Sequence, residues 1–136
     1  MNAEFVDTNV LVYANDRTGG EKPAMASALI MRLLESGTGV LSLQVLSEFY
    51  STATRKLGIT SEQAEAVIAD FAIWPIHRPT HASLLSACRL CRRYRISWWD
   101  ALLVQSAIEM EASVIWSEDL KDGQRFGSVT VRNPFR

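Results

Sequence analysis

Short apolar segments alternate with amphipathic helical segments along the whole of this 136-residue chain. Short apolar runs between turn signals predict strands at 4–7, 40–42, 73–76, 113–116 and 129–131. Apolar residues three and four apart, together with capping and stop signals, predict helices at 10–14, 23–36, 46–57, 60–72, 79–94 and 97–110. Strands that alternate with helices in this way favour an α/β sandwich with a mainly parallel central sheet.

Length and composition fit a single domain over residues 1–136, with enough chain to bury a core without disulfides or structural metal. The longest apolar runs, such as Val10–Ala14, are far shorter than the roughly 20 residues of a membrane-spanning helix. Glu4 stands where a signal peptide carries basic residues, so we expect a cytoplasmic protein with no membrane segment. Cys88 and Cys91 share an apolar helical face, which predicts buried thiols rather than metal ligands.

Four acidic residues stand where such a fold makes a ligand site. In an open parallel sheet, ligands bind at the carboxyl ends of the strands, where the strand order reverses. Asp7 ends the first predicted strand and Asp119 follows the strand at 113–116, so their carboxylates converge if those strands are neighbours. Asp100 interrupts a strongly apolar helix, where a buried carboxylate is costly unless it is paired or bound to a cation. Glu48 lies beside the apolar stripe of its helix, not opposite it.

Each acid also has a purely structural explanation. These are an N-cap for Asp7, a turn for Asp119, a capping box with Ser97 for Asp100, and an ion pair with Arg55 or Lys56 for Glu48. Taken together, acids at the ends or edges of buried elements are typical of a divalent-cation site. Mg²⁺ is usually held by one or two carboxylates and keeps waters that further carboxylates orient.

Five motifs follow one another in the order DTNVLVY at 7–13, QVLSEF at 44–49, WWDA at 98–101, SEDL at 117–120 and NPF at 133–135. This ordered set spans essentially the whole chain and resembles the PIN-domain ribonucleases, specifically VapC-type toxins of bacterial toxin–antitoxin pairs. The resemblance implies a Rossmann-like three-layer α/β/α sandwich that cleaves RNA with Mg²⁺ or Mn²⁺. It also implies a cytoplasmic homodimer inhibited by a small cognate antitoxin protein.

Transferred residue by residue, the resemblance implies a catalytic quartet of Asp7, Glu48, Asp100 and Asp119. Asp7 and Asp100 would bind the metal directly, and the other two acids would act through water. The polar residues that would orient these acids are Thr8, Asn9 and Ser117, the last in place of the more usual Thr. At the fourth corner, Glu118 and Asp122 remain alternatives to Asp119, which is chosen on the Ser-x-Asp spacing.

The formal net charge of −1 does not exclude a nucleic-acid partner, because without the four acids the rest of the chain carries +3. Arg89, Arg92 and Arg93 share one helical face and are the candidate RNA-binding residues, although such a cluster is also typical of a solvated face. No nucleophilic Ser or Cys arrangement competes with metal-dependent hydrolysis, in which the ion activates a water.

Three other functions fit parts of this pattern. A Mg²⁺-dependent phosphotransferase of the haloacid-dehalogenase kind needs a second Asp two residues after the first, where this chain has Asn9. A response-receiver-like domain needs adjacent acids and a late lysine, and neither arrangement is present. A non-catalytic PIN-like module that binds RNA or a protein remains an alternative, against which the complete acidic quartet argues.

Overall fold

The computed structural model describes residues 2–136, which form a six-stranded sheet in the order β3-β2-β1-β4-β6-β5. The strands are β1 (Ala3–Val6), β2 (Gly39–Ser42), β3 (Ile76–His77), β4 (Ala112–Trp116), β5 (Arg125–Phe126) and β6 (Val129–Arg132). The helices are α1 (Thr8–Ala14), α2 (Glu21–Ser36), α3 (Leu43–Lys56), α4 (Ser61–Asp70), α5 (His81–Tyr94) and α6 (Trp98–Glu109), with a 3-10 helix η1 (Phe71–Ile73).

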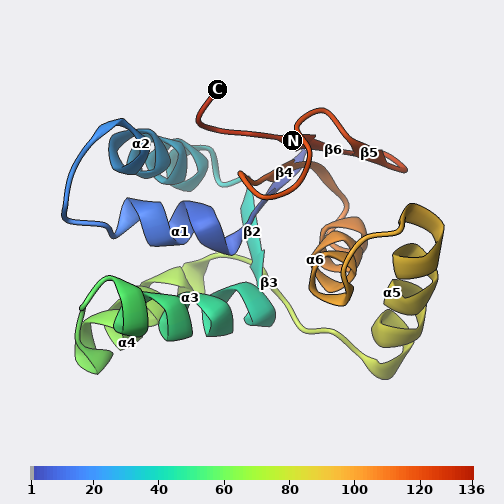
Figure 1. Ribbon diagram of the computed structural model, residues 1–136, viewed down its shortest axis with the longest axis horizontal. Helices are drawn as coiled ribbons and strands as arrows, with labels where there is room; N and C mark the ends of the chain where they lie inside the picture. Colours follow the sequence, from blue (N-terminus) through green and yellow to red (C-terminus); the bar gives the residue numbers. More distant parts are fainter. Residues whose placement is uncertain (1) are drawn as a thin grey trace.

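Every pairing in the sheet is parallel except that of β5 with β6. Helices α1–α4 lie on one side of the sheet and α5 and α6 on the other (Figure 1), which confirms the three-layer α/β/α sandwich. The chain builds the sheet outward from β1 to β3 and then returns to place β4 on the other side of β1. The strand order therefore reverses between β1 and β4, as the predicted ligand site requires.

The capping signals place several helices as predicted. Thr60 and Gln63 form a reciprocal capping box at the start of α4, and the Ser97 hydroxyl accepts a hydrogen bond from the backbone N–H of Asp100 at the start of α6. Gly39 in β2 lies against the ring of Trp74, where an added Cβ would be 2.6 Å from the indole carbons. Only glycine fits this approach without displacing the ring.

Three expectations differ from the structure. The predicted strand at 73–76 is instead η1 followed by the shorter edge strand β3, because Trp74 turns inward to pack on Gly39. The strand β5 was not predicted. The two cysteines, Cys88 and Cys91, are half-buried rather than buried. Among residues 2–136, none of the helices has the length and apolar character that crossing a membrane would require.

Candidate active site

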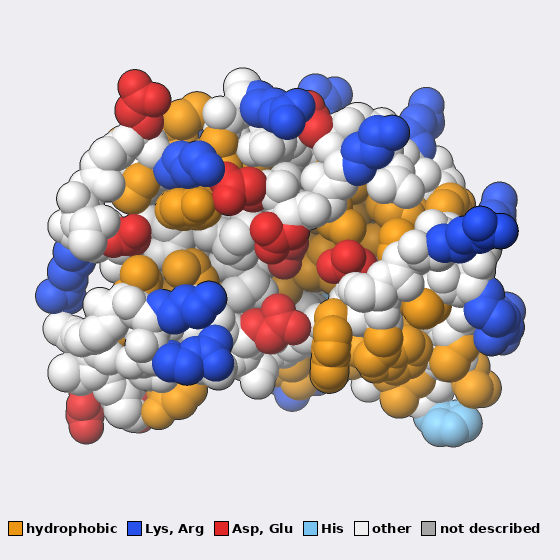
Figure 2. Space-filling view, viewed as in Figure 1, with side chains coloured by type: hydrophobic (Ala, Val, Ile, Leu, Met, Phe, Trp, Pro, Cys, Tyr) orange, Lys and Arg blue, Asp and Glu red, His pale blue; other side chains and the backbone are white. Residues whose placement is uncertain are grey.

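A cavity of about 470 Å³ opens at the carboxyl ends of β1 and β4, and all four predicted acids line it. The walls come from α1, from α3, from the start of α6 and from the segment after β4. Two further acids, Asp16 and Glu118, also line this cavity. Figure 2 shows acidic side chains gathered in the middle of this face of the molecule. Carboxylates that are far apart in the sequence therefore share one concave site.

Asp7 is the most buried of these acids, with 8% of its surface exposed, and it is the N-cap of α1. Its Oδ1 accepts a hydrogen bond from the backbone N–H of Thr8 at 2.7 Å, and its Oδ2 accepts one from the Ser117 hydroxyl at 2.7 Å. Burial raises the pKa of Asp7 to about 6, and the charges of Asp119 and Glu48 add to this effect, whereas the two hydrogen bonds oppose it.

Asn9 and Ser117 connect Asp7 to the segment after β4. The Asn9 amide nitrogen lies 3.1 Å from Asp7 Oδ2 and 3.2 Å from Asp119 Oδ2, and its Oδ1 accepts the backbone N–H of Glu118 at 3.1 Å. The Ser117 oxygen also accepts the backbone N–H groups of Asp119 and Leu120. These contacts fix the Asp119 carboxylate relative to Asp7.

Glu48 is held by neutral partners rather than by a cation. Its Oε2 accepts a hydrogen bond from the Thr8 hydroxyl at 3.0 Å, and its Oε1 accepts one from the Gln44 amide at 3.0 Å. The Gln44 amide also lies 3.3 Å from the carbonyl oxygen of Trp99, which ties α3 to the first turn of α6. The half-buried Asp100 follows in that turn. The alternative suggested by the sequence, an ion pair of Glu48 with Arg55 or Lys56, does not form within residues 2–136.

The three acids after β4 have different surroundings. Glu118 pairs with Lys22 at 2.7 Å and accepts a hydrogen bond from the Tyr13 hydroxyl at 3.0 Å. Asp122 accepts the backbone N–H of Asn133 at 2.9 Å and is not part of the cavity wall. Asp119 is therefore the acid of this segment whose carboxylate is linked to Asp7 through Asn9.

The predicted RNA-binding arginines, Arg89, Arg92 and Arg93, are exposed on α5 and do not line the cavity. One basic side chain does line it, that of Lys56 on the last turn of α3. The sequence gives Lys56 as a possible partner for Glu48 and not as a residue of the site. Lys56 follows Glu48 by eight residues, which is two steps of the four-residue helical repeat. This spacing places both side chains on the same face of the helix and is the signal that could have identified Lys56 as a residue of the site.

The PIN domain family matches residues 5–124 of the chain. The chain belongs to the PIN domain family. The fold matches solved structures that share 20% or less of its sequence, and likeness at that identity shows the fold alone. No curated protein sequence matches the chain significantly.

One such structure is the Mycobacterium tuberculosis toxin VapC20, which cleaves the sarcin–ricin loop. It is 20% identical to this chain and has a TM-score of 0.68, and the match covers 86% of this chain and 92% of that one. A second is VapBC2 of Rickettsia felis bound to a DNA fragment from its promoter, which is 18% identical. Its TM-score is 0.71, and the match covers 96% of this chain and 98% of that one. A third is a toxin–antitoxin complex from Klebsiella pneumoniae, 18% identical, with a TM-score of 0.69 over 98% of each chain.

The donor set of this PIN domain suits a hard divalent cation, because the cavity offers carboxylate oxygens and no thiol or imidazole. Within residues 2–136, no three Asp, Glu, His or Cys side chains form a ready cluster of ligands. A site with one or two direct carboxylate ligands and several retained waters fits both observations. A cation here would also offset the mutual repulsion that contributes to the raised pKa of Asp7.

Proposed function

We propose that this PIN domain is a Mg²⁺- or Mn²⁺-dependent endoribonuclease and the toxin of a toxin–antitoxin pair, acting in the cytoplasm as a single domain over residues 1–136. The observation that carries the proposal is the convergence of Asp7, Glu48, Asp100 and Asp119 on one cavity at the strand-order reversal. The likeness of the fold to toxins and toxin–antitoxin complexes supports it. We further propose RNA as substrate, a small antitoxin protein as inhibitor and a homodimer as the assembled form.

We assign the residues of the cavity the following roles. Asp7 and Asp100 hold the metal directly, and Glu48 and Asp119 orient waters. A divalent cation held there would supply a bound water of lowered pKa and positive charge to offset that of the phosphate. Thr8 and Gln44 fix the Glu48 carboxylate by donating one hydrogen bond to each of its oxygens.

Asn9 and Ser117 position Asp7 and Asp119 before substrate arrives, because their hydrogen bonds already join the two acids. Preorganised groups of this kind need little rearrangement during the reaction. This role accounts for two polar side chains being concentrated around one buried carboxylate.

The test is to incubate the purified protein with total RNA and Mg²⁺ and to map the new 5′ ends. We expect discrete cleavage that EDTA abolishes and that Asp100→Asn reduces by orders of magnitude. Asp122→Asn is the matched control, because Asp122 lies in the same segment as Asp119 but outside the cavity wall, and an asparagine oxygen can still accept the Asn133 N–H. Equal cleavage by Asp100→Asn and wild type would contradict the proposal.

A further inference from the structure

Four side chains of α3 form a single stripe along the wall of the acidic cavity. Gln44, Glu48, Thr52 and Lys56 follow one another at intervals of four residues, and all four line the cavity. Residues at this spacing lie on one face of a helix. The stripe therefore leads from the catalytic acids to the carboxyl end of α3, along the side of the groove that faces α1.

Of the residues that the structure describes, Lys56 is the only Lys or Arg that lines this cavity, against six acids. Lys56 is an exposed residue, and none of the ion pairs formed within residues 2–136 involves it. Lys22 near the other side of the cavity differs, because it is paired with Glu118. Lys56 thus offers a positive charge that no internal carboxylate neutralises, at the edge of a strongly acidic site.

From these contacts we propose that Lys56 binds a backbone phosphate of the RNA, and that the strand runs along the α3 stripe from the acids toward Lys56. The proposal rests on the proposed ribonuclease function and adds the path of its substrate. Figure 2 shows basic side chains over α3 beside the central acids.

The spacing decides which phosphate Lys56 contacts. Eight residues of α-helix separate Glu48 from Lys56, which is about 12 Å along the helix axis. A phosphate at Lys56 is therefore not the one at the acids but one further along the strand. A contact that holds substrate and transition state equally lowers KM and leaves kcat unchanged, and we expect this behaviour of Lys56 because it lies away from the reacting phosphate. Thr52, between the two, places a hydroxyl along the same path.

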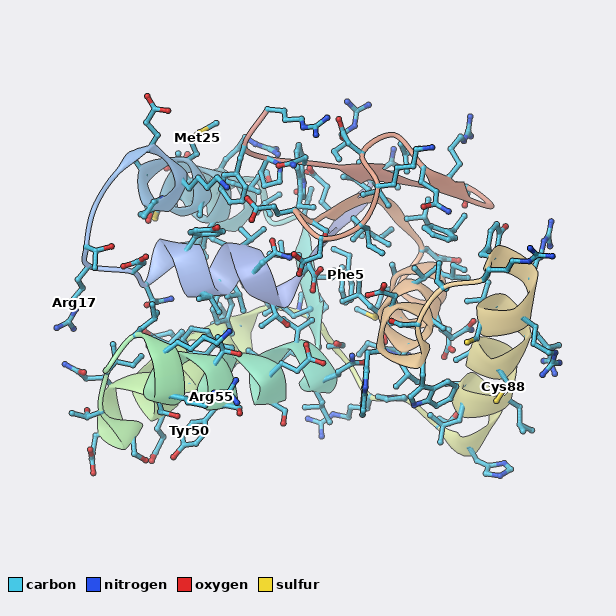
Figure 3. The ribbon with its side chains drawn as sticks, viewed as in Figure 1. Phe5, Arg17, Met25, Tyr50, Arg55 and Cys88 are labelled. Atoms are coloured by element: carbon cyan, nitrogen blue, oxygen red, sulfur yellow. The ribbon has the colours of Figure 1, made fainter. Side chains whose placement is uncertain are left out.

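The experiment compares Lys56→Met with Arg55→Met. Methionine removes the charge and keeps an apolar stem of similar length. Arg55, which is labelled on α3 in Figure 3, is the matched control. It is an exposed cation in the same turn as Lys56, and it is not among the residues that line the cavity. Binding of a fluorescein-labelled, mixed-sequence single-stranded RNA is measured by anisotropy in Mg²⁺ between 50 and 200 mM KCl. An Asp100→Asn background keeps the RNA intact.

We expect Lys56→Met to weaken binding about two- to fivefold, the range of one exposed ion pair. We also expect it to reduce the slope of log K against log salt by about 0.7, the value for one phosphate contact on a single strand. Arg55→Met should change the RNA affinity and the salt slope by much less. In the active protein, Lys56→Met should raise KM at constant kcat, and Lys56→Arg should restore KM.

The proposed phosphate contact is wrong if the slope of log K against log salt is unchanged in Lys56→Met. It is also wrong if Lys56→Met and Arg55→Met lose equal RNA affinity. A retained RNA affinity together with lost binding of a protein partner would also overturn it, in favour of a protein-binding role. If the wild-type protein cleaves RNA with Mg²⁺ while Lys56→Met keeps its KM, only this inference fails. If the wild-type protein cleaves no RNA, the proposed function itself fails.

Discussion

Replacing Asp7 with asparagine should abolish cleavage and yet stabilise the metal-free protein at neutral pH. The carboxyl group of Asp7 is buried among other acids, and its pKa is raised from 3.8 to about 6. A carboxyl whose pKa is higher in the folded than in the unfolded chain favours folding while it is protonated. The stability that it contributes is full below pH 3.8, falls as pH rises from 3.8 to 6, and is constant above that range.

The magnitude follows from the two pKa values. A difference of about two pKa units corresponds to a cost of roughly 3 kcal/mol for ionised Asp7 at pH 7. Asparagine removes this cost, but its amide group faces the Ser117 hydroxyl and the Asn9 amide, both of which donate to the present carboxylate. The Ser117 hydroxyl can rotate and accept from the new amide, so one mismatched contact remains, with the Asn9 amide, and it costs about 1 kcal/mol. The net gain in unfolding free energy at pH 7 is therefore about 2 kcal/mol, and at pH 4 the variant should be slightly less stable than wild type.

The assay is urea unfolding of both proteins in EDTA at pH 4, 5, 6 and 7, followed by circular dichroism. The difference in unfolding free energy between variant and wild type isolates Asp7, because other titrating groups contribute to both proteins. Adding Mg²⁺ at pH 7 should stabilise wild type much more than Asp7→Asn. The reasoning is refuted if the variant is less stable than wild type at pH 7, or if the difference does not shrink toward pH 4.

Two further changes test the packing and the outer face of the protein. Gly39→Ala places a methyl group against the Trp74 ring and should lower the unfolding free energy by roughly 1–3 kcal/mol, measured by urea unfolding; unchanged stability would show that the ring moves freely. The double variant Arg92→Ala and Arg93→Ala should weaken RNA binding and flatten its salt dependence if α5 contacts RNA. An unchanged slope would identify that face as merely solvated.

The sequence predicts the helices of this fold better than its short strands. Helix α6 is found from the Ser97 cap and its apolar residues, since both signals are local. The strand β5 has only two residues and is fixed by its pairing with β6 across Gly127, which adopts a positive φ of 62°. Its one local sign is the Gly127–Ser128 pair, a typical two-residue hairpin turn. The turn at Phe71–Ile73 depends on Trp74 meeting Gly39 from a distant strand, which no local pattern shows.

In the site, too, the sequence predicts some features, and it does not show contacts between residues that lie far apart along the chain. Asp7 and Asp119 are predicted to meet because parallel neighbouring strands end at one edge of the sheet, and β1 does pair with β4. The hydrogen bond from Thr8 to Glu48 is not predicted, because the two residues lie 40 positions apart in different helices. An ion pair of Glu48 with Arg55 or Lys56 is an alternative that the sequence leaves open, but neither pair forms within residues 2–136.

The repulsion among the clustered carboxylates affects both the stability of the fold and the binding of RNA. Hydrogen bonds from Thr8, Asn9 and Ser117 hold the carboxylates of Asp7, Glu48 and Asp119 close together, so their repulsion is built into the fold. The same concentrated charge repels RNA phosphates. A divalent ion at the proposed site would remove both penalties at once, because it would bind the folded state and reverse the sign of the local field. RNA affinity and metal-induced stabilisation should therefore rise over the same range of Mg²⁺ concentration.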